Sequence, residues 1–357
     1  MRVAVLGVGL IGGSIGLAAK ACVEDVEVVG FGRSPERLER ARELGAIDRV
    51  AGSLEQALDG ASVCFCCAPV GALDDQIAAA LAAAGDDCVV TDVGSTKGGV
   101  VAAATDPRFV GGHPIAGAET AGVEHARADL FQGATWYLTP TSESSGVLFE
   151  RLHRLVAALG ARPVAIDAES HDRLLATVSH LPHVLANALV TQTAGALGEE
   201  DAALPRVGPS FRDATRVAGA NSAIWTDIYL ANREAIATEV DAVVERLQKA
   251  AGLLRAGDAD AITAWNEQAA DARRRLLEAD LAGGVVHELR TTVPNRPGIV
   301  AEVALALGKA GVNIVDMALA PAPDMRSGAI TLWIAGDAEA NRARQLIDDL
   351  GFPVAEA

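Results

Sequence analysis

The stretch that decides the fold is Arg2-Val-Ala-Val-Leu-Gly-Val-Gly-Leu-Ile-Gly12, at the start of the chain. It opens with a short apolar run typical of a buried strand, and residues 12–21 are small residues typical of a helix. Between them lies the motif Gly7-Val8-Gly9-Leu10-Ile11-Gly12, a GxGxxG in the strand-to-helix setting that it needs. Gly7 permits a tight turn, Gly9 lets the backbone approach a pyrophosphate, and Gly12 lets the helix pack on the strand. We expect a dinucleotide site here rather than a glycine-rich turn without a ligand, with phosphate at the helix N-terminus.

The alternation of strand-like and helix-like segments continues to residue 167. Strand-like runs lie at 26–31, 61–68, 88–93, 135–139 and 163–167, and helix-like runs at 35–44, 72–84 and 145–159. Strands that alternate with helices require crossover connections, which produce a mostly parallel, doubly wound sheet. The sequence therefore predicts an α/β Rossmann-type domain over residues 1–167.

Two further changes of pattern divide the rest of the chain. Over residues 168–283 helical periodicity dominates, with long helices expected to begin near Ser170, Ser222 and Asp258. After the pair Gly283-Gly284 the order becomes strand, helix, strand, strand, helix, strand. This βαββαβ order is typical of a ferredoxin-like module. We predict an all-α domain at 168–283 and an α+β domain at 284–357.

Composition excludes several classes of protein. The 357 residues exceed what one core usually organises, and 50% hydrophobic residues exclude a disordered chain. The 30 Lys and Arg against 47 Asp and Glu give a net charge of −17, which repels duplex DNA and anionic membrane surfaces. We expect neither nucleic acid nor membrane as a partner. The five cysteines are odd in number and lie mostly in apolar runs, which favours a reducing, cytoplasmic setting.

No metal site is expected. Cys64 and Cys67 form a CxxC, but alternation along the strand-like run 62–68 places their side chains on opposite faces. His180 and His183 are three residues apart without the HExxH pattern, and Pro182 lies between them. We expect these histidines to shape the end of a helix.

Cofactor specificity is expected at the end of the second strand, in Gly30-Phe-Gly-Arg33-Ser34-Pro35. NAD-binding proteins place there an acidic residue that holds the ribose 2′-hydroxyl, and this stretch has none. Arg33 is placed to pair with a 2′-phosphate and Ser34 to donate a hydrogen bond to it. Alternatively, Ser34 caps the next helix and Arg33 is solvated. The two roles of Ser34 are compatible, and we expect NADP in preference to NAD.

Three motifs in a fixed order carry a resemblance to a known family. They are Asp92-Val-Gly-Ser95-Thr-Lys97-Gly98, Gly111-Gly-His113-Pro-Ile-Ala-Gly-Ala-Glu119 and Ser179-His-Leu-Pro-His183. The second is expected to be a glycine-rich loop after the fifth strand. With Phe211-Arg-Asp-Ala-Thr-Arg216 and Trp225-Thr-Asp-Ile228, residues 1–280 resemble the prephenate/arogenate dehydrogenase (TyrA) family. The tail, with Asn295-Arg-Pro-Gly298 before a helix and Asn313 after it, resembles an ACT domain.

The resemblance implies oxidative decarboxylation of prephenate, to 4-hydroxyphenylpyruvate, or of arogenate, to tyrosine, in tyrosine biosynthesis. It implies that His113 accepts the hydroxyl proton and that Ser95 positions the hydroxyl. It further implies that Arg216 binds the side-chain carboxylate, that His171 and Ser179 line the cleft, and that Glu119 lies at its mouth. Lys97 is left open between a ligand contact and a solvated loop lysine. Nothing in the sequence separates prephenate from arogenate.

The same resemblance implies regulation and assembly. Asn295, Gly298 and Asn313 are the expected binding residues for an amino-acid effector such as tyrosine, with a purely structural ACT domain as the alternative. The apolar helix over 174–196 favours a homodimer. Two other functions stay open: another small-hydroxyacid dehydrogenase, and an amino-acid or redox sensor without catalysis. The absence of lysine from residues 167–196 disfavours the first, and the presence of His113, Ser95 and Arg216 disfavours the second.

Overall fold

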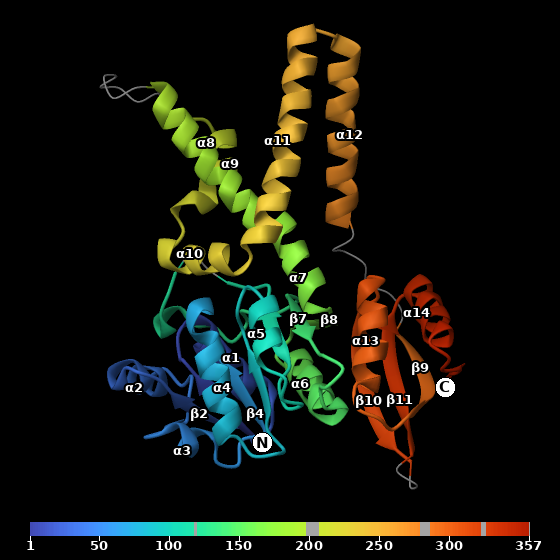
Figure 1. The fold of residues 1–357 in the computed structure, drawn as a ribbon. Helices are drawn as coiled ribbons and strands as arrows, with labels where there is room; N and C mark the ends of the chain where they lie inside the picture. The colour runs from blue at the N-terminus through green and yellow to red at the C-terminus, as the bar shows by residue number, and fades with distance from the viewer. Residues whose placement is uncertain (118–119, 198–206, 279–285, 323–325, 357) are drawn as a thin grey trace. The chain divides into compact units, whose positions relative to one another are not determined.

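The computed structural model of the chain describes residues 1–117, 120–197, 207–278, 286–322 and 326–356 (Figure 1). The chain divides into two compact units, Met1–His171 with Gly284–Ala357, and Asp172–Gly283. Each unit is described separately below.

A five-stranded parallel sheet forms the centre of the first unit. Its strands are β1 (Arg2–Leu6), β2 (Glu27–Phe31), β3 (Arg49–Val50), β4 (Val63–Cys66) and β5 (Val89–Asp92), in the order β3-β2-β1-β4-β5. The helices between them are α1 (Leu10–Cys22), α2 (Pro35–Glu43), α3 (Leu54–Leu58) and α4 (Leu73–Ala83). The direction of the connections reverses between β1 and β4, which is where doubly wound sheets bind ligands. The predicted Rossmann-type fold is confirmed.

Both faces of this sheet are covered, because successive side chains point to opposite sides. Val3 and Val5 belong to the core that includes α1, whereas Ala4 and Leu6 belong to the core that includes α3 and α4. The same alternation separates the two cysteines of the CxxC motif. Cys64 lies in the second core and Cys67 packs against the first, as predicted.

A second, three-stranded sheet follows, with β6 (Gly111–Pro114), β7 (Thr135–Thr139) and β8 (Arg162–Ala165) in chain order. It adjoins the first sheet through the backbone of Val90, which donates to Arg108 O and accepts from Val110 N. β6 runs antiparallel to β7, and β7 runs parallel to β8. Helices α5 (Gly98–Ala103) and α6 (Gly146–Ala158) complete this part.

The second unit is helical in all of its described residues. It contains the end of α7 (Ala168–Leu175), the π-helical turn η3 (Ala176–His180), and α8 (Leu181–Leu197), α9 (Pro209–Thr215), α10 (Ser222–Ala231), α11 (Arg233–Ala256) and α12 (Ala259–Glu278). Because of the π-helical turn, the angle around the helix axis between His171 and Ser179 differs from the value expected for a regular α-helix. Among the described residues, only the run Ala168–Ala196 is long and apolar enough to cross a membrane by those two criteria, and 33% of its most apolar window is buried.

The tail of the chain follows the predicted βαββαβ order and belongs to the first unit. Its elements are β9 (Val286–Pro294), α13 (Ile299–Lys309), β10 (Ile314–Pro321), β11 (Ser327–Ala335), α14 (Asp337–Asp349) and β12 (Val354–Glu356). The strands form an antiparallel sheet in the order β10-β11-β9-β12. A Cβ on Gly308 would lie 1.7 Å from Ala165 O, so α13 packs on β8 at backbone distance.

Candidate functional site

The GxGxxG turn has the geometry that a bound pyrophosphate requires. Gly7 follows β1 with φ of 101°, and Gly9 is the N-cap of α1. A Cβ on Gly12 would lie 2.3 Å from Gly7 O, so only glycine allows α1 to begin this close to the strand. A Cβ on Gly9 would meet no atom of the described residues within 4 Å, which leaves space in front of the helix N-terminus. The turn therefore fits a dinucleotide phosphate.

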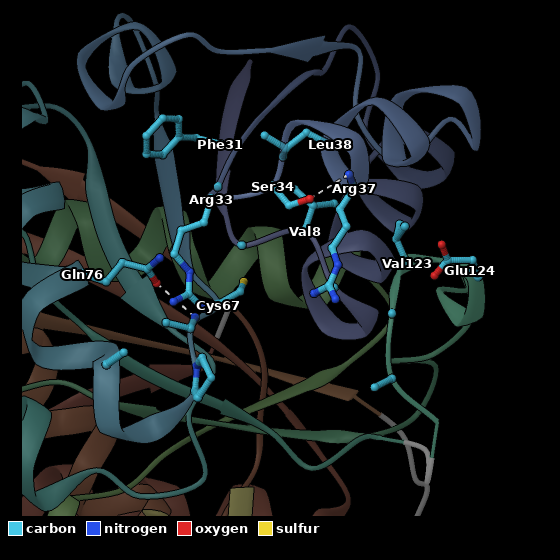
Figure 2. A pocket seen from close by; sticks show the side chains of 18 of the residues that line it. Val8, Phe31, Arg33, Ser34, Arg37, Leu38, Cys67, Gln76, Val123 and Glu124 are labelled. Carbon is cyan, nitrogen blue, oxygen red and sulfur yellow. Dashed lines mark hydrogen bonds between the residues drawn. The ribbon is translucent and has the colours of Figure 1, made fainter. Parts of the chain in front are cut away.

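A cavity of about 950 Å³ opens at this turn, at the C-terminal ends of β1, β2 and β4 (Figure 2). Of the predicted cofactor residues, Gly7, Gly9, Arg33 and Ser34 line it, whereas Leu10, Ile11 and Gly12 do not. Leu10 and Ile11 instead pack against the core beneath. The wall also includes Cys67, Gln76 and residues 121–124, which sequence patterns did not indicate.

Two arginines reach this cavity from the end of β2. Arg33 and Arg37 both line it, and their side chains extend into it in the same direction (Figure 2). Ser34 caps α2, accepting a hydrogen bond from Arg37 N at 3.3 Å, and Pro35 occupies the first turn, as the capping hypothesis predicted. That cap places Arg37 in the first helical turn beside Arg33. Arg37 was not among the residues predicted from the sequence, although the Ser34-Pro35 cap is the signal that could have indicated it.

The cavity wall is electrically neutral at Cys67, which lines it together with the two arginines. Burial, with contributions from Cys66 and Asp92, raises the pKa of the Cys67 thiol well above its usual range. Beside it, Gln76 Oε1 accepts a hydrogen bond from Ala68 N at 3.1 Å. A cofactor here therefore meets a protonated thiol and an amide rather than a thiolate.

His113 lies in strand β6, so the prediction of a glycine-rich loop over 111–119 is wrong for its first four residues. Gly111–Pro114 pair with β7, and His113 stands opposite Tyr137. A Cβ on Gly112 would lie 2.6 Å from Asp92 O and 2.7 Å from Thr91 Oγ1. Gly112 is thus explained by the close approach of β6 to the end of β5, and Gly111 by the side chain of Thr139 on β7, 2.2 Å from where its Cβ would be. Glu119 lies outside the described residues.

His113 and His171 form a buried pair of imidazoles. His113 Nδ1 lies 2.9 Å from His171 Nε2, and the rings meet edge to face with centroids 5.1 Å apart. The fractional exposure of His113 is 8% and that of His171 is 0%. Tyr137 meets the other side of His171 edge to face at 5.5 Å. One ring nitrogen must donate and the other accept, so the contact links the tautomers of the two histidines.

Ser95 is half-buried in the loop between β5 and α5. Two residues later, Lys97 is fully buried and its Nζ donates to Asp92 Oδ2, which excludes the alternative of a solvated loop lysine. A charged side chain with no exposure needs an oppositely charged or hydrogen-bonding partner inside the protein, and Asp92 is such a partner for Lys97.

The remaining predicted site residues lie in the helical unit. Ser179 is half-buried within the π-helical turn. Arg216 is exposed and begins the 3₁₀ turn Arg216–Gly219, so it does not continue the helix that carries Arg212.

His180 and His183 have protein partners within the same helical unit. Asn232 Nδ2 lies 3.2 Å from His180 Nδ1, and the ring of His183 stacks on Trp225 at 3.6 Å. Tyr229 Oη lies 2.5 Å from His183 Nδ1. Burial lowers the pKa of His183. Among the described residues, no group of three or more metal-ligating side chains is present.

The three predicted effector residues of the tail have different surroundings. Asn295 lines a cavity of about 350 Å³ between β9, β11 and the start of α6. Gly298, with φ of 78°, lies against Ser142, whose carbonyl oxygen would be 2.4 Å from a Cβ there. Asn313 is half-buried, and its Oδ1 is buried without a hydrogen-bond partner.

Comparison with known proteins identifies the family. The model "Prephenate dehydrogenase, nucleotide-binding domain" matches residues 15–165, and "Prephenate dehydrogenase, dimerization domain" matches residues 167–268. The prephenate dehydrogenase of Bacillus subtilis is 31% identical over 350 residues, covering 96% of this chain and 94% of that relative. The chain belongs to the prephenate dehydrogenase family.

Solved structures of this family share the fold. Prephenate dehydrogenase from A. aeolicus, in complex with hydroxyphenyl propionate and NAD+, has a TM-score of 0.73 and 28% identity, over 77% of this chain and 98% of that one. Synechocystis arogenate dehydrogenase has a TM-score of 0.69 and 26% identity, over 77% of this chain and 100% of that one. Both neighbours cover less of this chain than the Bacillus relative does.

Proposed function

We propose that this chain oxidises and decarboxylates prephenate or arogenate with hydride transfer to a nicotinamide cofactor. It is an oxidoreductase of tyrosine biosynthesis. Hydride leaves the ring carbon that bears the hydroxyl, the ring carboxylate leaves as CO₂, and the ring becomes aromatic. The product is 4-hydroxyphenylpyruvate from prephenate or tyrosine from arogenate. A nicotinamide bound at the turn would supply the hydride acceptor, so the protein orients the reactants, takes the hydroxyl proton and returns a proton to the oxygen of the aromatic product.

The observation that carries the proposal is the buried His113–His171 pair beside the end of β5. The tautomer in which His113 Nδ1 donates to His171 leaves the acceptor lone pair of His113 on Nε2. In this tautomer Nε2 accepts the hydroxyl proton and His171 holds the ring in orientation. Ser95, in the loop after β5, positions the hydroxyl.

Three further residues complete the substrate site in this proposal. Arg216 binds the side-chain carboxylate of the substrate, Ser179 lines the cleft, and Glu119 lies at its mouth. A guanidinium suits this task because its paired N–H groups match a carboxylate.

The cofactor is a nicotinamide dinucleotide, and we infer that NADP is preferred. Arg33 and Arg37 supply two cations at the end of β2, where a ribose 2′-phosphate lies in this fold. The segment 30–35 contains no carboxylate that would hold a 2′-hydroxyl.

We propose that the chain works as a cytoplasmic homodimer with three domains, 1–167, 168–283 and 284–357. Val178, Leu230 and Leu254 of the helical unit are each more than 60% exposed, which favours a protein interface there. The apolar run Ala168–Ala196 carries the buried histidines at 171, 180 and 183, which a lipid-facing helix would not accommodate. Sedimentation equilibrium, with 36.6 kDa as the monomer mass, measures the assembly.

We propose that the tail is an ACT domain that binds tyrosine. The cavity beside Asn295 is large enough for an amino acid, and its wall combines apolar side chains with Glu143 and Arg296. Because this cavity includes residues 145–147 at the start of α6, a ligand there contacts both the tail and the nucleotide-binding part.

The test is the initial rate of reduced-cofactor formation, with prephenate and arogenate each crossed against NAD and NADP. We expect turnover with at least one pair and a fall in kcat of about 100- to 10,000-fold in His113→Asn, since a positioned acid or base contributes this much. His287→Asn, on β9 of the tail, is the matched control and keeps the parental rate. No turnover in any of the four combinations contradicts the function, and a near-parental His113→Asn contradicts the role of His113.

The same assay measures cofactor preference. We expect Arg37→Ala to raise the KM for NADP by about 10- to 100-fold, the value of one or two charge-assisted hydrogen bonds, and to leave the KM for NAD within about threefold. A parent enzyme with a lower KM for NAD than for NADP contradicts the preference.

A further inference from the structure

Asp92 connects the backbones that carry Ser95 and His113. It is the last residue of β5 and is fully buried. Its Oδ2 accepts a hydrogen bond from Gly94 N at 2.8 Å, and its Oδ1 accepts one from Gly112 N at 3.1 Å. Gly94 immediately precedes Ser95, and Gly112 immediately precedes His113.

Lys97 is the counter-ion that allows this carboxylate to stay charged inside the protein. Its ammonium group donates to Asp92 Oδ2, and both side chains have 0% exposure. A buried ion pair adds little stability compared with apolar side chains of the same size. The role of the Asp92 carboxylate therefore lies in the two backbone N–H groups, of Gly94 and Gly112, that its oxygens hold.

The packing around the carboxylate leaves little room for movement. A Cβ on Gly94 would lie 2.4 Å from Leu73 Cδ1 and 3.0 Å from Asp92 Oδ2. On the other side, β6 approaches β5 so closely that Gly112 cannot carry a side chain. A displacement of the Asp92 side chain therefore moves the backbone before Ser95, the backbone before His113, or both.

We infer that Asp92, neutralised by Lys97, is a positioning residue that sets the distance between Ser95 and His113. This inference rests on the proposed roles of Ser95 and His113. Asp92 acts through the two backbone N–H groups, and Lys97 acts through Asp92.

The test compares Asp92→Asn with the double variant Asp92→Asn/Lys97→Met. An amide has one acceptor oxygen, and its NH₂ group repels the remaining donors, so at least one backbone bond is lost in both variants. The single variant also leaves the Lys97 ammonium group buried without its partner carboxylate. The double variant removes that charge, and it stays informative even where the single variant folds poorly.

We expect kcat per folded site to fall about 100-fold in both variants, the effect of a misplacement of about 1 Å. The KM for the cofactor should stay within about threefold, because Asp92 does not line the cofactor cavity. The double variant should regain thermal stability relative to the single one without regaining kcat. A purely structural role predicts that kcat returns together with stability.

Two controls separate geometry from stability. Asp106→Asn makes the same chemical change in the Asp106–Arg108 pair, and Ile77→Ala removes buried volume under α4. Both are expected to destabilise the protein while keeping kcat. Histidine Cε1 NMR, assigned with His113→Asn, should show a shifted His113 signal in the Asp92 variants and an unchanged His287 signal.

The outcomes distinguish this inference from the proposed function. If His113→Asn keeps its rate, the proposed role of His113 fails and the inference fails with it. If His113→Asn loses activity while either Asp92 variant keeps kcat within threefold and an unshifted His113 signal, only the positioning role is overturned. A double variant that recovers kcat also overturns it.

Discussion

The buried histidines of this structure differ in whether their ring nitrogens have a hydrogen-bond partner. His153 on α6 is 1% exposed, and within the described ranges neither ring nitrogen has a partner with hydrogen-bond geometry, although the backbone of Ile314 lies nearby. Burial lowers the pKa of His153 to about 4, against the opposing influence of Asp316. The ring is therefore a neutral packing group near pH 7, in contrast to the paired His113.

This lowered pKa predicts a pH dependence of stability. The unfolded chain binds a proton at His153 near pH 6.5 and the folded chain only near pH 4, so its contribution is fully present above pH 6.5 and is lost as the pH falls toward 4. His153→Leu should reduce the loss of unfolding free energy between pH 7 and pH 5 by about 2 kcal/mol. Urea unfolding at both pH values measures this, with His287→Leu as the control. An equal loss in parent and His153→Leu would show that the ring titrates normally.

At the level of elements, the turn from β1 to α1 shows two glycines with different tasks. Gly12 is needed for packing, because Gly7 O occupies the place of its Cβ. At Gly9 no atom of the described residues lies within 4 Å of a Cβ, so packing does not require glycine there. We propose that this space is kept for the cofactor, so that the motif serves both the fold and the ligand.

Alanine at these two positions should separate the two tasks. Gly12→Ala should cost about 1–3 kcal/mol of stability or more, the usual cost of overpacking. Gly9→Ala should keep the parental melting temperature and raise the cofactor KM on the order of tenfold or more, because a methyl group occupies ligand space. Melting curves and steady-state kinetics measure both. A stable Gly12→Ala, or a Gly9→Ala with parental KM, would contradict this division.

At the level of the whole molecule, the first unit combines the nucleotide-binding part and the tail around one continuous core. That core includes Val5 of β1, Leu152 of α6 and Leu307 of α13. Arg154 of α6 also donates to Met317 O of β10 at 3.1 Å. A ligand bound in the tail, as we propose, would therefore contact a core that is continuous with the part that carries the cofactor cavity.

Tyrosine binding to the full chain tests the proposed role of the tail. Isothermal calorimetry should give saturable heat with tyrosine, and Asn295→Ala should weaken the affinity about tenfold, the value of a lost hydrogen bond. Asn341→Ala, on exposed α14, is the matched control. Absence of heat with both tyrosine and phenylalanine at millimolar concentration would leave the tail with a structural role only.

Much of the fold could be predicted from sequence patterns that span only a few residues. Alternation predicted the strands within a few residues, GxGxxG located the cofactor turn, and Ser34-Pro35 located the cap of α2. These patterns succeed because each depends on neighbours within one helical turn or one strand. They failed at β6, whose glycines resemble a loop until β5 and β7 are placed beside them, and at the π-helical turn after α7.

The sequence by itself determined the nucleotide-binding fold, the order of the parts and the identity of His113 as a chemical candidate. Only the tertiary structure decided that His113 pairs with His171 and that Asp92 holds the backbone of Gly112. It also decided that Lys97 is buried against Asp92, because burial depends on the elements packed around the loop. The physical reason for the first two contacts is separation along the chain. His113 and His171 are 58 residues apart and Asp92 and Gly112 are 20 apart, so no local pattern records these contacts until the sheet brings them together.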